Sequence, residues 1–331
     1  MSKPPLKGVS SMGMDFSLNI GILAASARDV AGQALLKLGA DHPELVIVNA
    51  DLATSTRTLA FAEQYPDRSF NVGIAEQNMV SVASGMAREG LHPIVLTMAP
   101  FLSMHACEQV RTDVCYGKVP VIMLGTYAGY SGGISGATHS GLEDCAIMCS
   151  FGGMTVLEPG DPWLIAKMLE AAYELNSPVY MRLGVEAQEP IYDFEKVEYK
   201  IGKALIPREG TDATIIASGV IVHHAMQAAE ELAAEGIDVR VVDMHTIKPI
   251  DEEAVLEAAK TGAIVCAQDH TKIGGLGAQV ARVLAENACG CKFKILGTPD
   301  EYVPLATTEF LYHRNELDAE GLAKNVRKLL A

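Results

Sequence analysis

The apolar pattern of this chain switches repeatedly between the period of a helix and the continuous run of a buried strand. Apolar runs at 44–51, 92–98 and 119–126 are typical of strands buried on both faces, and segments of helical period at 26–39 and 75–90 lie between them. Strands that alternate with helices form mainly parallel sheets covered by helices on both faces. The pattern therefore predicts an α/β protein.

One polar stretch interrupts this alternation. Residues 184–210 carry Pro190 and Pro207 and have no clear apolar period, whereas strand and helix patterns run before and after them. A chain of 331 residues is long enough to bury two cores. We therefore expect two doubly wound, mainly parallel-sheet domains at 18–187 and 211–331, joined by a linker at 188–210.

Charge and hydropathy exclude two classes of partner. The net charge of −15 repels a phosphate backbone, so we expect no nucleic-acid partner. No apolar run approaches the roughly 20 residues that a membrane helix needs. Residues 1–18 lack the basic start and the apolar run of a signal peptide, so we expect no membrane contact and a cytoplasmic location.

A carboxylate stands at the point where open α/β sheets bind ligands. In the segment FNVGIAEQNMVSVASGMAREG, Glu76 follows a predicted strand at 69–73 and falls in the first turn of the next helix. A carboxylate there also favours the helix dipole. Local sequence therefore leaves both a functional and a structural role open for Glu76.

The string Gly-Ile-Ala-Glu-Gln-Asn-Met, followed by a helix rich in alanine and glycine, resembles the signature of the transketolase family, and the resemblance extends over most of the chain. It implies a pyrimidine-binding domain at 18–187 and a transketolase C-terminal domain at 211–331. It also implies thiamine diphosphate as cofactor and Glu76 as the catalytic residue, hydrogen-bonded to N1′ of the aminopyrimidine. A carboxyl group suits this task because it must share a proton with a ring nitrogen.

Four more residues match cofactor-binding segments of that family. Phe101 in APFLSM matches an aromatic platform under the pyrimidine, and His139 in GATHSG matches a Thr-His site beside cofactor and substrate. Asp51 and Gln109 lie in matching segments, NADLATST and CEQVR. The structural alternatives are a core position for Phe101, a capping or solvated role for Asp51 and Gln109, and an incidental place in a glycine-rich loop for His139.

The resemblance also implies a set of substrate-binding residues. Arg28, Ser55 and Arg182 correspond to positions that grip the anionic end of a sugar, a task that suits arginine because its planar fork meets phosphate oxygens bidentately. Arg28 and Ser55 could instead form a surface ion pair and a turn or cap. Ser135 replaces an aspartate and Tyr127 replaces a histidine of conventional transketolases, so we expect a different choice of sugar.

The motif that binds Mg²⁺ and the diphosphate in this family, Gly-Asp-Gly, does not occur in the sequence. The nearest string, Gly160-Asp161-Pro162, has a proline where a glycine is needed for close approach. A full-length transketolase is also about twice as long. We therefore expect no metal ligand from this chain. The resemblance implies that a separate N-terminal transketolase subunit holds Mg²⁺ and the diphosphate, in an assembly of two copies of each chain.

The function implied is ketol transfer, in which a two-carbon unit passes from a ketose bearing a phosphate or sulfonate to an aldose. One alternative is the beta subunit of the first component of a 2-oxoacid dehydrogenase, which has a similar length and a related glutamate. Another is a non-catalytic regulatory subunit that keeps only the fold. The Thr-His loop and Arg182 favour the sugar enzyme, and the retained Glu76 argues against a silent subunit.

Overall fold

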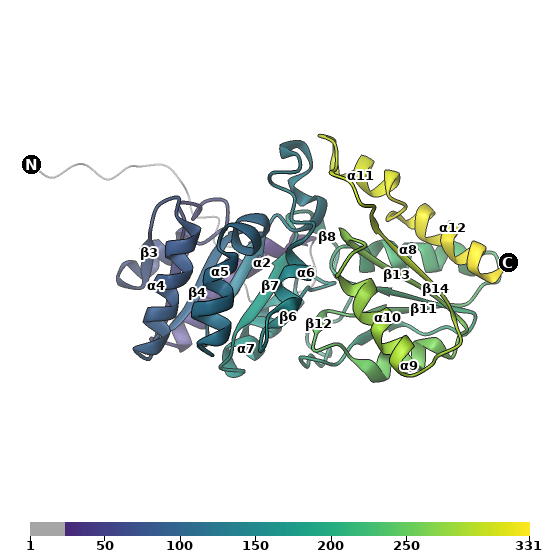
Figure 1. The fold of residues 1–331 in the computed structure, drawn as a ribbon, viewed down its shortest axis with the longest axis horizontal. Coiled ribbons are helices and arrows are strands. Elements are labelled where there is room, and N and C mark those ends of the chain that lie inside the picture. The colour runs from purple at the N-terminus through teal and green to yellow at the C-terminus, as the bar shows by residue number, and fades with distance from the viewer. Residues whose placement is uncertain (1–23) are drawn as a thin grey trace, which may run out of the picture.

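The computed structural model describes residues 24–331, which form two α/β domains side by side (Figure 1). The start of the first predicted domain at residue 18 and the prediction for residues 1–18 lie outside the described residues. Each domain has a sheet with helices on both faces. The predicted fold class, two doubly wound and mainly parallel sheets, is confirmed.

The first sheet has seven strands in the order β12-β6-β7-β5-β4-β2-β3. All neighbours in it are parallel except β12 and β6. Its central strands are buried along their whole length, which explains their continuous apolar sequences. The strands are β2 (Leu45–Asn49), β3 (Ser69–Asn71), β4 (His92–Met98), β5 (Ile122–Thr126), β6 (Thr155–Leu157), β7 (Val179–Leu183) and β12 (Thr246–Lys248).

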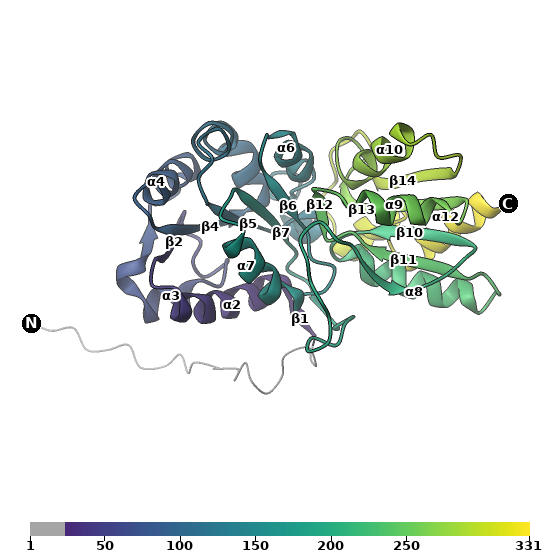
Figure 2. The ribbon, with the colours of Figure 1, turned by 90° about the horizontal axis from the view of Figure 1, so that it is seen from below.

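Helices cover both faces of this sheet. Figure 2 shows α2, α3 and α7 below it and α4 and α6 above it. Each group buries its apolar face in a separate core, as expected for a doubly wound domain. The helices are α2 (Ala27–Asp41), α3 (Leu59–Gln64), α4 (Glu76–Arg88), α5 (Cys107–Gln109), α6 (Asp144–Ser150) and α7 (Leu164–Glu174).

The apolar spacing at 103–117 also predicts a helix, but this segment is not a regular α-helix. It consists of a π-helical turn at Phe101–His105, the short α5, and a second π-helical segment at Val110–Tyr116. Turns of this kind are rare and gather at functional sites, because the extra residue per turn changes where side chains point. Periodicity alone cannot detect them, because the apolar spacing still looks helical.

The second sheet has five strands in the order β14-β13-β10-β11-β9. The helices α8, α11 and α12 pack in one core, and α9 and α10 pack in the core on the other face. The strands are β9 (Leu205–Arg208), β10 (Ala213–Ala217), β11 (Val239–Asp243), β13 (Ala263–Thr271) and β14 (Lys292–Thr298). The helices are α8 (Ile221–Ala233), α9 (Glu252–Ala259), α10 (Leu276–Glu286), α11 (Thr308–Arg314) and α12 (Ala319–Leu330).

The predicted linker at 188–210 is not wholly a linker. Its last part forms β9, which pairs antiparallel with β11 at the edge of the second sheet. Pro207 suggested a loop, but an edge strand tolerates proline because one side of the strand needs no donor. The first residue of the predicted linker, Gln188, belongs to β8 (Ala187–Gln188), which pairs with β1 (Ala25–Ser26).

The two domains share structure at their junction. The strand β12 belongs to the second domain in sequence but pairs antiparallel with β6 of the first sheet. One hydrophobic core also extends from α4 and β4 of the first domain to β10 and α10 of the second. No helix within residues 24–331 is long and apolar enough to cross a bilayer.

Candidate functional site

The predicted cofactor residues follow neighbouring strands of the first sheet. Asp51 comes after β2, Glu76 after β3, Phe101 after β4 and Tyr127 after β5, and these four strands are adjacent and parallel. Their carboxyl ends therefore meet at one edge of the sheet, where open α/β sheets bind ligands. Along that edge the order is Glu76, Asp51, Phe101 and Tyr127, because β3 lies on the outer side of β2.

Glu76 is the first residue of α4 and is only 3% exposed. Its Oε2 lies 3.1 Å from Nδ1 of His105, a largely exposed side chain of the π-helical turn. The helix dipole stabilises a carboxylate at this position. Sequence reasoning missed His105, because the contact depends on the irregular turn that carries it.

Phe101 begins the same π-helical turn and is half-buried. Its ring meets the ring of His139 edge to face, with centroids 5.4 Å apart and planes at 72°. The Nδ1 of His139 lies 2.8 Å from the hydroxyl oxygen of Thr138. The structure therefore brings Phe101 and His139 together, as expected for two residues of one site, and the exposed Ser135 lies on the same glycine-rich loop.

Arg28, Ser55 and Tyr127 also lie together. The Arg28 Nη1 donates to the Tyr127 hydroxyl at 2.8 Å and to the carbonyl oxygen of Ser55 at 3.2 Å. The guanidinium carbon lies 5.3 Å from the centre of the Tyr127 ring. Ser55 thus contributes its backbone and not its hydroxyl. The buried Nε of Arg28 has no acceptor among the described residues.

Asp51 and Gln109 have different surroundings. Asp51 adopts a left-handed φ of 62° and exchanges two hydrogen bonds with the side chain of Asn71, at 3.0 and 2.9 Å. Asn71 Oδ1 also accepts from the Gly73 amide, so Asp51 helps to shape the turn that leads to Glu76. The buried Oε1 of Gln109 has no donor within residues 24–331.

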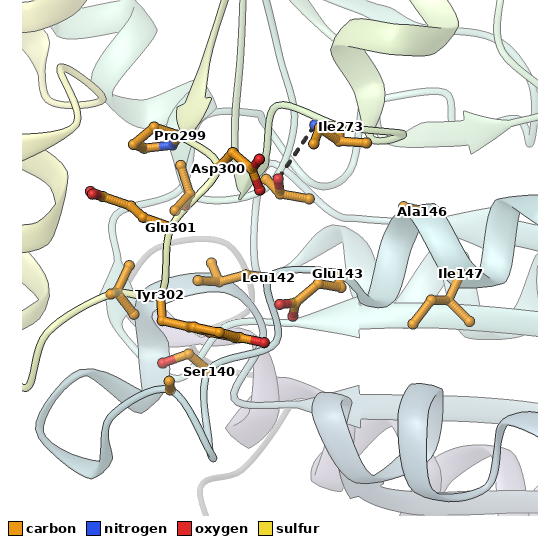
Figure 3. A pocket seen from close by; sticks show the side chains of 14 residues that line it. Ser140, Leu142, Glu143, Ala146, Ile147, Ile273, Pro299, Asp300, Glu301 and Tyr302 are labelled. Atoms are coloured by element: carbon orange, nitrogen blue, oxygen red, sulfur yellow. Dashed lines mark hydrogen bonds between the residues drawn. The ribbon is translucent and has the colours of Figure 1, made fainter.

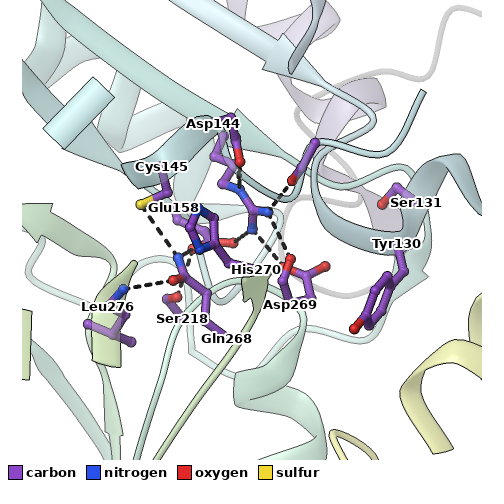
Figure 4. A network of polar contacts seen from close by, with 12 residues as sticks. Tyr130, Ser131, Asp144, Cys145, Glu158, Ser218, Gln268, Asp269, His270 and Leu276 are labelled. Carbon is purple, nitrogen blue, oxygen red and sulfur yellow. Dashed lines mark hydrogen bonds and ion pairs between the residues drawn. The ribbon is translucent and has the colours of Figure 1, made fainter. Parts of the chain in front are cut away.

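Arg182, which was expected to bind the anionic end of the substrate, is buried inside the protein and paired with internal groups. Its side chain is 1% exposed, and partners within the described residues occupy every N–H of its guanidinium. The carboxylates of Asp144, Glu158 and Asp269, labelled in Figure 4, surround this guanidinium. The bonds are Nε to Asp144, Nη1 to Glu158 and Asp269, and Nη2 to the carbonyl oxygens of Gly141 and Asp269.

The Arg182 cluster joins the two domains. Asp144 and Glu158 belong to the first domain, whereas Asp269 lies on β13 of the second. Burial alone would lower the pKa of Arg182, but the three carboxylates raise it well above its ordinary value. Burial raises the pKa of Asp269 to about 7, against the opposing effect of the guanidinium. The guanidinium is thus permanently charged and fully engaged in the interface.

A pocket of about 460 Å³ opens between the domains (Figure 3). One wall comes from the end of the glycine-rich loop and the start of α6, including Ser140 and Glu143, and the other from Asp300 to Tyr302. Burial raises the pKa of Glu143, and the Asp144 carboxylate adds to the shift. The predicted site residues, all within the described chain, do not line this pocket, so it does not mark the cofactor edge.

The edge of the first sheet suits the aminopyrimidine half of thiamine diphosphate. It offers a buried carboxyl on Glu76, an aromatic face on Phe101 and an unpaired acceptor on Gln109. Within residues 24–331, no group of histidine, cysteine, aspartate or glutamate side chains is arranged to hold a metal.

Comparison with known proteins gives the family. The sequence matches the transketolase pyrimidine-binding domain over residues 24–188 and the transketolase C-terminal domain over residues 202–321. A subunit of a 6-deoxy-6-sulfo-D-fructose transketolase from Clostridium sp. (strain MSTE9) is 38% identical over 298 residues, which cover 90% of this chain and 92% of the relative.

Two further relatives are alike in length and domain content. One of the subunits of an apulose-4-phosphate transketolase from Phocaeicola vulgatus is 37% identical, over 88% of this chain and 93% of the relative. A solved structure of a split-gene transketolase, an inactive beta4 tetramer, superposes with a TM-score of 0.86 at 37% identity, over 92% of this chain and 98% of that one. The chain therefore belongs to the transketolase family.

Proposed function

We propose that this chain is the subunit of a thiamine-diphosphate-dependent transketolase that activates the cofactor, with Glu76 as the catalytic residue. The observation that carries the proposal is the position of Glu76: a 3% exposed carboxyl at the first residue of α4, on the sheet edge that also carries Phe101. When bound, thiamine diphosphate supplies the electron sink for breaking and forming the carbon–carbon bond.

Each residue on this edge has a separate task. The Glu76 carboxyl shares a proton with the ring nitrogen of the aminopyrimidine, and burial protects that proton from exchange with water. His105, 3.1 Å from Glu76, fixes the carboxyl's orientation. Phe101 offers its face to the pyrimidine, and Asp51, Gln109 and His139 complete the binding edge. The hydrogen bond between Asp51 and Asn71 and the ring contact between Phe101 and His139 support this assignment, because they fix these side chains before a ligand binds.

We further propose that a separate subunit supplies the ligands of the diphosphate and Mg²⁺. The relatives named as subunits, which match nine-tenths of this chain, support this arrangement. An assembly of two copies of each chain and a cytoplasmic location stay predictions.

The substrate proposed is a ketose with a terminal phosphate or sulfonate. Arg28 supports it, because its charged side chain lies beside Tyr127 with one buried N–H unpaired among residues 24–331. The names of two relatives, one acting on a sulfo-sugar and one on a sugar phosphate, agree with an anionic end group. Ser135 and His139 lie on the loop that borders Phe101, where they would face the sugar chain.

The two alternatives are not favoured. The named relatives are transketolase subunits, and none of those reported above is a 2-oxoacid dehydrogenase component. A subunit that had become purely regulatory would have no reason to keep a buried carboxyl at the sheet edge, since an unneeded buried carboxyl costs stability.

The test uses this chain purified together with its natural partner subunit, thiamine diphosphate and Mg²⁺. Ketol transfer is assayed against ketose phosphates and sulfonates, and 2-oxoacid decarboxylation is assayed in parallel. Glu76→Ala should lower turnover by at least about 100-fold, because a positioned proton-transfer group contributes that much. Glu89→Ala, a matched control at the other end of α4, should keep wild-type turnover. Near-normal ketol transfer by Glu76→Ala would refute the proposal.

A further inference from the structure

The glycine-rich loop at 127–141 is held by the second domain as well as the first. It carries Ser135 and His139, and its middle part, Gly129–Ser135, forms a 3₁₀ helix. The loop closes on itself through a hydrogen bond from the Gly129 amide to the Gly141 carbonyl, at 2.9 Å. A contact that fixes one part of this compact loop therefore also fixes the position of its other residues.

Tyr130 is the anchor of the loop in the second domain. The side chain is completely buried, and its hydroxyl oxygen lies 2.6 Å from Oγ1 of Thr298, the last residue of β14. Its ring meets the ring of Tyr312 on α11 edge to face, with centroids 5.4 Å apart. The hydroxyl of Thr308 donates to the Tyr130 carbonyl oxygen at 3.3 Å. Side chain and backbone of Tyr130 are thus both bound by the second domain.

The backbone of the loop also lies against the second domain. A side chain at Gly129, which has a φ of +59°, would overlap the Asp269 carboxylate. A Cβ at Gly133 would come within 2.9 Å of the Ala306 carbonyl oxygen. Only glycine permits such approaches. The loop backbone at Gly129 and Gly133 therefore packs closely against the second domain. Figure 4 shows Tyr130 of this loop beside Asp269.

The far end of the loop reaches the cofactor edge. The His139 amide donates to the Gly136 carbonyl at 3.0 Å, and the His139 ring touches Phe101. A shift at Tyr130 would therefore move His139 against Phe101. The loop therefore connects the second domain, through Tyr130, to the sheet edge, through His139 and Phe101.

We propose that Tyr130, Thr298 and Tyr312 are positioning residues for ketol transfer: the second domain sets the place of Ser135 and His139 at the substrate by gripping Tyr130. The inference rests on the proposed function. It gives the C-terminal domain a part in catalysis beyond packing. It also accounts for the pairing of two buried hydroxyls that lie 168 residues apart in the sequence, where an unpaired hydroxyl would be costly.

The test uses the holoenzyme with its partner subunit and measures two quantities. The first is hydrogen exchange at the amides of 127–141, and the second is kcat/KM for the accepted ketose. Tyr130→Phe and Thr298→Val should each raise exchange in the loop and lower kcat/KM by about fivefold, since each leaves one buried hydroxyl unpaired. Thr298→Ser, which keeps the hydroxyl, should show wild-type exchange in the loop and wild-type kcat/KM. Tyr173→Phe, which removes a hydroxyl bonded to Glu44 away from the loop, should change neither.

The double variant shows whether the two substitutions act through the same hydrogen bond or independently of each other. If the hydroxyls act on each other, Tyr130→Phe with Thr298→Val should be no worse than either single variant. Additive losses would overturn the inference, as would unchanged exchange in the loop. Raised exchange with wild-type kcat/KM would show a structural contact only and would also overturn it. Absence of ketol transfer in the wild-type holoenzyme would instead sink the proposed function, and the exchange data would still decide whether Tyr130 holds the loop.

Discussion

Replacing Arg182 by methionine removes the one cation from a cluster of three buried carboxylates. Methionine has a similar length and no charge, so the change deletes the guanidinium with little loss of volume. Asp144, Glu158 and Asp269 would then face each other without compensation, in surroundings where each is nearly inaccessible to water. We expect the domain interface to fail first, because Asp269 is the member that belongs to the second domain.

The size of the effect follows from burial. Breaking a buried ion pair by removing one partner costs about 3–5 kcal/mol, and here one removal leaves three carboxylates uncompensated. A whole domain is stable by only about 5–15 kcal/mol. Arg327→Met is the matched control, because Arg327 also pairs with two carboxylates, Glu231 and Glu235, but is 35% exposed. A pair of that kind is worth about 0–1 kcal/mol.

The loss should depend on pH. The pKa of Asp269 in the folded protein is raised to about 7. Its protonated form therefore contributes its full stability at a pH below the ordinary pKa of aspartate, and this contribution is lost as the pH rises through about 7. Arg182 opposes the rise in this pKa, so without it the pKa of Asp269 would be higher still. The deficit of Arg182→Met relative to wild type should therefore be larger at pH 8 than at pH 5.

Urea unfolding followed by circular dichroism at both pH values measures this. Arg182→Met should lose several kcal/mol of unfolding free energy at pH 8 and recover part of it at pH 5, while Arg327→Met stays near wild type at both. If Arg182→Met unfolds like wild type, the reasoning about the cluster is refuted. A normally folded variant that loses only substrates with a terminal anion would return Arg182 to a role in binding the anionic end of the substrate.

Two further predictions concern the sheet edge. Arg28→Met should lower kcat/KM for ketoses with a terminal phosphate or sulfonate by about 10-fold to 100-fold, because a hydrogen bond to a charged group contributes that much. Neutral ketoses should be affected much less. Equal losses for both kinds of ketose, or a similar loss in the neighbouring control Arg57→Met, would show that Arg28 has a structural role. Phe101→Leu should weaken thiamine diphosphate binding to the holoenzyme up to about 10-fold, because the stacking contact is lost while apolar volume is kept; unchanged affinity in a calorimetric titration would place Phe101 in the core.

Much of the fold could be predicted from periodicity. The strand at 92–98 was predicted with the observed bounds, and most other predicted strands and helices differ by a few residues at their ends. Burial explains this success, because a strand enclosed on both faces must be apolar throughout and a helix must carry one apolar stripe. The short elements β9, β12 and α11 were not predicted, since few residues carry too little pattern.

For the candidate site, sequence placed Glu76 after a strand and at the start of a helix, and the family resemblance named its neighbours. It could not show that His105 would contact Glu76, because that contact depends on a π-helical turn. Nor could it show that Ser55 would offer its carbonyl oxygen to Arg28 in place of its hydroxyl. Such details depend on backbone geometry that residue types do not specify.

The sequence by itself determined the α/β alternation and the position of Glu76, because both follow from the chemistry of neighbouring residues along the chain. Only the tertiary structure decided what Arg182 does and how the loop of His139 is held. The partners of Arg182 come from Asp144, Glu158 and Asp269, and the hydroxyl of Tyr130 meets that of Thr298, 168 residues away. An arginine at the end of a buried strand needs negative partners, but which groups supply them is settled only when the two domains pack together.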